Sequence, residues 1–128
     1  MIWQAGQPGP LEIQVTIGLA SGWFTLAALN FDSQKVPISR IDSEDADGDA
    51  LFRVDLAQDT LFKLQVLAGY VSGADTDVMV AVRKGGAVLP CIDNATKVQN
   101  KTGNSYKSQS IGKIKQGQNL TFNFSVWS

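Results

Sequence analysis

The sequence contains no histidine, and this absence excludes several kinds of chemistry. Histidine is the side chain whose ordinary pKa lies in the physiological range, so it dominates general acid–base catalysis and is a common zinc ligand. Without it the chain has no Ser-His-Asp triad, no Cys-His pair and no zinc site of the usual kind. We therefore expect a protein that is not an enzyme.

Cysteine is almost absent too, because Cys91 is the only one in the chain. A single cysteine cannot form a disulfide within the chain, which fits the cytoplasm or a virion better than secretion. Residues 1–15 lack the basic segment and the continuous apolar run of a signal peptide. No stretch approaches the roughly 20 apolar residues of a membrane helix. We expect no membrane span and a cytoplasmic or virion-associated location, with signal-independent export as the alternative.

The chain also has little net charge, since 11 basic and 12 acidic residues give −1 at pH 7. Such a chain is a poor partner for nucleic acid, which is bound through an excess of basic side chains. The charges are nevertheless divided, with a net −7 in residues 1–82 and a net +6 in residues 83–128. Either strands of the two halves pair within one fold and cancel this division, or the division orients identical subunits head to tail.

What the chain has in quantity is strict alternation of apolar and polar residues, which is typical of half-buried β-strands. Leu11, Ile13, Val15 and Ile17 alternate with polar residues in the first such segment. Paired glycines in residues 83–86 predict a hairpin turn, because they supply the positive φ of a type I′ turn. The other segments expected to be strands are 36–40, 52–56, 62–70, 78–82, 87–89 and 120–126.

Residues 23–31 are apolar on both faces of the strand that they are expected to form. Strict alternation places Trp23 and Ala27 on one face, and Phe24 and Leu26 on the other. The second apolar face needs a cover, which a loop, the N-terminal arm or another chain can supply.

Eight or so short strands, regular turn signals and no helix predict an all-β protein. We expect a single-domain antiparallel β-sandwich of the jelly-roll or immunoglobulin-like kind over residues 11–128, with a β-barrel as the alternative. The polar residues 90–110 predict a long surface loop, with a short strand near Tyr106 as an option.

Residues 1–10 hold two prolines and two glycines and predict an extended arm rather than a helix. Ile2 and Trp3 are too apolar for a purely solvated tail. We expect them either to dock on their own domain or to reach a neighbouring subunit, in which case they are the assembly residues.

Five acids in residues 42–49 form the sharpest local feature of the sequence. Alternating carboxylates around a glycine can converge oxygen ligands on one point, as calcium requires. A second acidic segment at 75–77 can complete a site if the two loops lie at the same end of the sandwich. The alternative is a solvated hairpin tip that favours solubility and discourages edge pairing. The candidate calcium ligands are Asp45, Asp47, Asp49, Asp75 and Asp77.

Three tryptophans are many for a chain of this length. Exposed aromatic rings can stack on the faces of sugars, while Asn side chains bind hydroxyl groups. Trp127, Asn119 and Asn123 share the outward side of the last expected strand and predict a carbohydrate-binding face. The alternative is that the tryptophans fill the core or an interface.

These features favour a small, non-enzymatic β-sandwich that works as a homo-oligomer and recognises a ligand, either a carbohydrate or one bound with calcium. The alternative is a self-assembling structural subunit of a virion, sheath or inclusion, which uses its N-terminal arm and its oppositely charged halves. The oligomeric mass and its response to calcium separate the two hypotheses.

Overall fold

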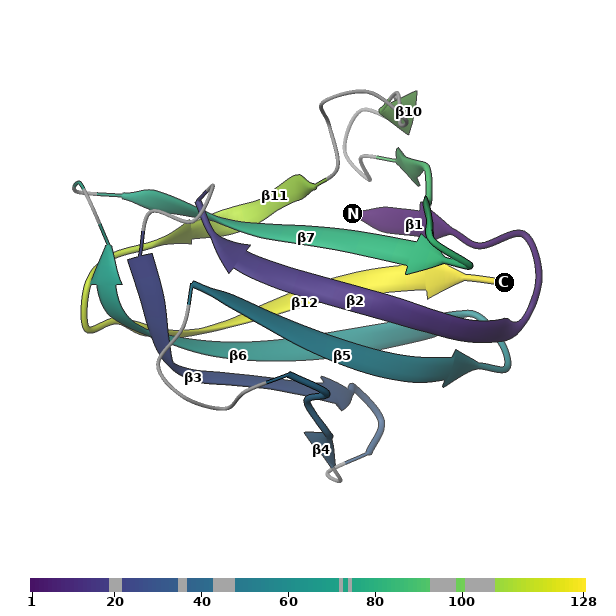
Figure 1. The fold of residues 1–128 in the computed structure, drawn as a ribbon, viewed down its shortest axis with the longest axis horizontal. Helices are drawn as coiled ribbons and strands as arrows, with labels where there is room; N and C mark the ends of the chain where they lie inside the picture. Colours follow the sequence, from purple (N-terminus) through teal and green to yellow (C-terminus); the bar gives the residue numbers. More distant parts are fainter. Residues whose placement is uncertain are drawn as a thin grey trace.

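The computed structural model describes residues 1–18, 22–34, 37–42, 48–71, 73, 75–92, 99–100 and 108–128. Within these residues the chain forms strands and no helix, so no helix there is long and apolar enough to cross a membrane. The strands make two sheets that share one core, which confirms the predicted all-β sandwich. Figure 1 shows the two layers with their long strands running in similar directions.

Sheet A holds seven strands and sheet B holds five. In spatial order, sheet A contains β10 (Gln99–Asn100), β9 (Cys91–Ile92), β1 (Ile2–Gln4), β12 (Asn119–Trp127), β6 (Thr60–Val71), β3 (Gly22–Phe31) and β4 (Pro37–Ile38). Sheet B contains β11 (Gln109–Ile114), β7 (Thr76–Lys84), β2 (Gly9–Ile17) and β5 (Asp49–Leu56), with β8 (Ala87–Val88) beside β7. The pairs are antiparallel except for β1 with β12, which is parallel.

The core forms because alternate residues of the long strands point between the sheets, where apolar surface leaves water. Ile13 of β2 and Phe52 of β5 face it from sheet B, and both are fully buried. Phe62 of β6 and Phe124 of β12 face it from sheet A, with ring centroids 5.4 Å apart. The alternation read from the sequence therefore identified the buried side of these strands correctly.

The N-terminal residues join sheet A as strand β1, between β12 and β9. Trp3 is only 1% exposed, and its ring meets Phe124 edge-on at a centroid distance of 5.4 Å. Ile2 is also buried, beside Ser125 and Ile92. Of the two positions expected for these residues, the structure has the one within their own domain.

Strands from the acidic and basic halves of the chain are neighbours in both sheets. β12 pairs along its length with β6, and β11 pairs with β7. An ion pair joins the halves directly, with Lys113 Nζ 3.1 Å from Asp77 Oδ1. This pairing within one fold is the first of the two explanations for the divided charge.

The faces expected for residues 23–31 are wrong at the start of β3. Trp23 is 43% exposed, whereas Phe24 and Ala27 are both buried. The register between β3 and β6 shifts twice here, once between Trp23 and Phe24 and once between Phe24 and Leu26. Such bulges change which side alternate residues face, and sequence periodicity alone does not reveal them.

The expected surface loop at 90–110 is wrong in part, because the segment includes β9, β10 and the start of β11. Tyr106 lies outside the described residues. The hairpin turn is confirmed: Lys84 pairs with Ala87, and Gly85 and Gly86 between them have φ of 59° and 83°.

Candidate functional site

The acidic candidates for calcium binding lie near one end of sheet B. β5 and β7 both run antiparallel to β2, so the loops that precede them emerge at the same end. Asp45 and Asp47 lie outside the described residues, whereas Asp49 is the first residue of β5 and Asp77 the second of β7. Asp75 is exposed in the bend before β7.

The carboxylates of Asp49 and Asp77 have partners within the protein. Gln14 Nε2 donates to Asp49 Oδ2 at 3.0 Å. Ser110 Oγ and Lys113 Nζ donate to Asp77 Oδ1 at 2.8 and 3.1 Å. The hydrogen bond from Ser110, then that from Lys113, holds the pKa of Asp77 below its ordinary value of 3.8. Among the described residues no three acidic, cysteine or histidine side chains are placed to hold a metal ion.

Arg40 donates hydrogen bonds to both ends of the acidic segment 42–49. Its Nε donates to Asp42 Oδ1 at 3.0 Å, and its Nη2 donates to the carbonyl oxygen of Asp49 at 3.1 Å. The Arg40 side chain is only 9% exposed. Burial raises the pKa of Asp42, but hydrogen bonds from Arg40 and from the backbone of Leu51 lower it further, so it lies below 3.8.

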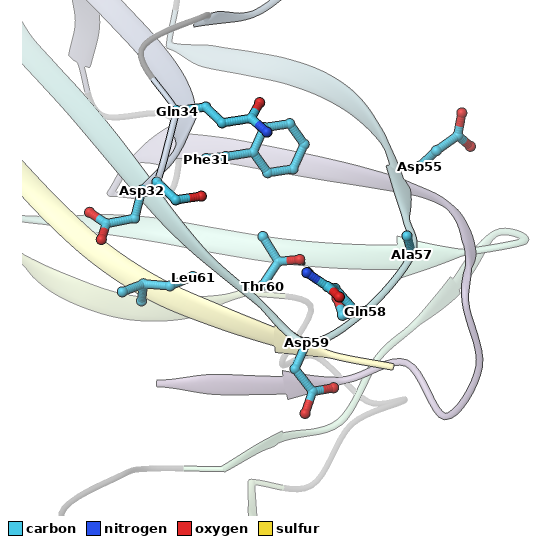
Figure 2. A pocket seen from close by; sticks show the side chains of 10 residues that line it. Phe31, Asp32, Gln34, Asp55, Ala57, Gln58, Asp59, Thr60 and Leu61 are labelled. Carbon is cyan, nitrogen blue, oxygen red and sulfur yellow. Dashed lines mark hydrogen bonds between the residues drawn. The ribbon is translucent and has the colours of Figure 1, made fainter.

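A cavity of about 320 Å³ opens where β5 turns into β6. Asp32, Asp55 and Asp59 stand around it, and Figure 2 shows their carboxylates pointing away from one another. Asp59 Oδ1 accepts hydrogen bonds from the backbone nitrogen and hydroxyl of Ser128 at 2.9 and 3.2 Å. The arrangement does not converge these acids on one point.

The outer face of sheet A has a different character. It is formed by the residues of β3, β6 and β12 that point away from the core, and Lys63 is the only charged residue in those three strands. Five of the six large apolar side chains that are exposed in the described part of the chain lie on it. These are Trp23, Leu26, Leu61, Tyr70 and Trp127.

Trp23 and Tyr70 form a stacked aromatic pair at one end of this face. Their centroids are 5.0 Å apart and their planes differ by 18°. The two residues are register partners on β3 and β6, and both remain more than 40% exposed. Gly69 lies against the Trp23 indole, because a Cβ there would stand 2.6 Å from Thr25 Oγ1 and closer still to Trp23 Nε1. We refer to Trp23 and Tyr70 as the aromatic pair.

Amide and hydroxyl side chains follow the aromatic pair along the face. Asn119 is the register partner of Leu67, in the outward row that precedes the pair, and its Oδ1 accepts a hydrogen bond from Gln65 Nε2 at 3.3 Å. Thr121 and Asn123 continue this side of β12 beside Gln65 and Lys63. The face therefore carries both hydrogen-bonding groups and exposed rings.

The three residues expected to bind a sugar, Asn119, Asn123 and Trp127, share this face but do not form one cluster. Trp127 is eight residues beyond Asn119 on the same strand, a separation of roughly 27 Å at about 3.4 Å per residue. Sequence reasoning missed the aromatic pair, because strict alternation placed Trp23 on the same face as Ala27, which is buried. Gly69 within a strand pattern was the available signal, since such glycines mark bulges or close approaches.

A hollow of about 440 Å³ lies beside Leu26 at the edge of the same face. Ala28, Ile38 and Phe52 contribute to its lining. Among the described residues β4 pairs with Leu29 and Asn30 of β3, further along the strand than Leu26. The hollow lies at the side of the sandwich, where Leu26 of sheet A and Phe52 of sheet B both line it.

Comparison with known proteins finds no family model, no curated protein and no solved structure that matches this chain. The two outer faces differ in their exposed groups. The face with the aromatic pair exposes Trp23, Tyr70 and Trp127 to solvent.

Proposed function

We propose that the protein is a non-enzymatic carbohydrate-binding β-sandwich domain that uses the outer face of sheet A. The observation that carries this proposal is the exposed aromatic pair on an almost uncharged sheet face, which also carries the amides of Gln65 and Asn119 further along the strands. A face of this kind offers flat apolar rings and hydrogen-bonding groups on one surface.

Sugars have the complementary chemistry. A pyranose ring presents C–H groups on its faces and hydroxyl groups around its edge. The C–H face packs against an aromatic ring, whose π-surface is electron-rich. The hydroxyls are both donors and acceptors, as are the amides of Gln65 and Asn119, which offer an NH₂ group and a carbonyl oxygen each.

The direct test is binding of the purified protein to an immobilised glycan panel, with Trp23→Ala compared with the unchanged protein. We expect binding to one class of glycan and its loss in Trp23→Ala, while near-ultraviolet circular dichroism retains a folded signal. Ile41→Ala is the matched control, because Ile41 is 44% exposed and lies on the segment beside β5, away from this face. A panel with no signal, or equal loss in both variants, would refute the proposal.

A second candidate function follows from the same exposed side chains. Exposed apolar side chains also fit an interface between copies of the chain, as the assembly hypothesis requires. Light scattering separates the two: a monomer that binds glycans supports the carbohydrate proposal. An oligomer that Trp23→Ala or Tyr70→Ala dissociates supports self-association through this face.

The calcium hypothesis rests on the two acidic loops emerging at one end of sheet B. Its test is the melting temperature and mass in EDTA and in millimolar calcium, for the unchanged protein and for Asp45→Asn with Asp47→Asn. A calcium-dependent rise that the double variant loses supports a site in this loop. An identical melting temperature and mass in EDTA and in calcium would identify the acidic segment 42–49 as a solvated tip.

A further inference from the structure

The two aromatic groups on the outer face of sheet A lie at opposite ends of the same strands. Trp127 ends β12, and the aromatic pair lies beyond the row of Leu26, Leu67 and Asn119 at the other end. Trp127 is eight residues from Asn119, and the pair lies two register steps further out, beyond Phe24 and Ala68. At about 3.4 Å per residue this places the two groups roughly 34 Å apart.

We infer that the ligand is an internal stretch of a linear polysaccharide, which lies along β12 and β6 and contacts both the aromatic pair and Trp127. This inference rests on the proposed function and specifies its substrate class. A single sugar or a disaccharide is too short to contact both groups. A linear chain of several sugar units can reach from one to the other.

The residues between the two groups suit an extended chain. The outward positions of β12 after Asn119 hold Thr121, Asn123 and Ser125, which are short and uncharged. β6 lies beside β12 along this stretch, with Leu120 to Val126 paired in unbroken register to Val66 to Thr60. Figure 1 shows the two strands running alongside each other over that length. No bulge interrupts this stretch, and the register shifts between β3 and β6 lie only at its far end, beside the aromatic pair. A chain can therefore follow the surface from Trp127 towards that pair.

The consequence is a dependence of affinity on chain length. A disaccharide can engage the aromatic pair alone, whereas a longer chain also engages Trp127. The second contact then forms within the same complex, at the effective concentration set by the first. Affinity should rise with length until the chain spans both groups.

The experiment is isothermal titration calorimetry with cello-, malto-, xylo- and chito-oligosaccharides, each as disaccharide and hexasaccharide. We expect one series to bind, with the hexasaccharide bound roughly tenfold or more tightly than the disaccharide. Trp127→Ala should lower the affinity for the hexasaccharide to that for the disaccharide and leave the disaccharide unchanged. Ile41→Ala, a variant with similar exposure outside the face, should change neither value.

Other outcomes separate this inference from the proposed function. Equal affinity for both lengths, with no effect of Trp127→Ala, would overturn the spanning mode and keep a carbohydrate site at the aromatic pair. Loss of binding in Trp127→Ala for both lengths would place the site at Trp127 alone and also overturn it. No binding in any series, together with a silent glycan panel, would refute the proposed function and this inference together.

Discussion

The two outer faces of this sandwich arise from the same alternation of residues but differ in chemistry. The four long strands of sheet B hold eight charged residues, whereas β3, β6 and β12 of sheet A hold Lys63 alone. Conversely, five of the six exposed large apolar side chains of the described residues lie on the sheet A face. Charged and exposed apolar side chains of the long strands are therefore separated by sheet, although strands of the two sheets alternate along the chain.

Several polar groups of the sheet B face bind one another. Arg53 Nη2 lies 3.2 Å from Glu12 Oε1, and Arg83 Nη1 donates to Gln14 Oε1 at 2.9 Å. Gln14 in turn donates to Asp49. Charged and amide groups of this kind are well solvated, whereas the rings on sheet A keep apolar surface in contact with solvent. Exposed apolar patches of that kind mark binding or association surfaces in many proteins.

The largest loss of stability is expected from a substitution on the side of sheet A that faces the core. Trp3→Ala should lower the free energy of unfolding by about 3–5 kcal/mol, because it empties a buried site beside Phe124. Trp127→Ala should change it by no more than about 0.5 kcal/mol, as exposed substitutions usually do. Urea denaturation of both variants measures this contrast. Similar losses would show that Trp127 supports the fold and that the outer face is not free for a ligand.

A smaller effect is expected from Gly69→Ala, which places a Cβ against Trp23 and Thr25. The crowding should destabilise the protein by about 1–3 kcal/mol and weaken glycan binding by displacing the indole. Trp23→Ala removes one of the two crowded groups, so adding Gly69→Ala to it should cost clearly less. This double-mutant cycle tests whether Trp23 takes its position because Gly69 has no side chain. Urea denaturation gives the stability of each variant, and tryptophan fluorescence reports any change around the indoles. Additive losses would contradict it.

Lowering the pH should destabilise the protein through carboxylates on the sheet B side. β3, β6 and β12 of sheet A contain no carboxylate side chain. The pKa values of Asp42 and Asp77 are lowered in the folded state, so both groups contribute stability above their unfolded pKa. That contribution is lost as the pH falls below about 4 and through the folded pKa values. Asp42→Asn should reduce the slope of unfolding free energy against pH in this range. An unchanged slope would show that Arg40 does not stabilise the carboxylate.

The smallest effect is expected at the exposed ion pairs of sheet B. Lys113→Met removes the pair with Asp77, in which both side chains are largely exposed, and should cost about 0.2–1 kcal/mol at low salt. High salt should abolish most of this difference by screening. Lys63→Met on sheet A, which removes a lysine from an otherwise uncharged face, is the matched control and should leave stability within about 0.5 kcal/mol. A larger loss for Lys63→Met would show that the sheet A face depends on its one charge.

Much of the fold was predictable because alternation is a local property. The strands around Ile13, Phe52, Phe62 and Phe124 were expected from period-two patterns, and each faces the core on the expected side. The turn at Gly85 was predictable for the same reason, since a two-residue hairpin needs positive φ at adjacent positions. β9 and β10 were missed because strands of two residues carry no periodic signal.

The candidate site was predictable only in part. Asn119, Asn123 and Trp127 were placed on one outward side of the last strand, and they lie there. The aromatic pair was not foreseen, because its exposure depends on the register shifts around Phe24. A shift of one residue moves every later side chain to the other face of the sheet.

The sequence by itself determined that this protein is all-β, which strands have a buried side, and that histidine chemistry is excluded. Those properties follow from composition and from periodicity within single segments. Only the tertiary structure decided that Trp3 is buried while Trp23 and Trp127 are exposed. It also decided that the long strands of sheet B hold eight charged residues, whereas β3, β6 and β12 hold Lys63 alone. Both depend on which distant strands pair and in what register, and pairing is set by the packing of the whole core rather than by any one segment.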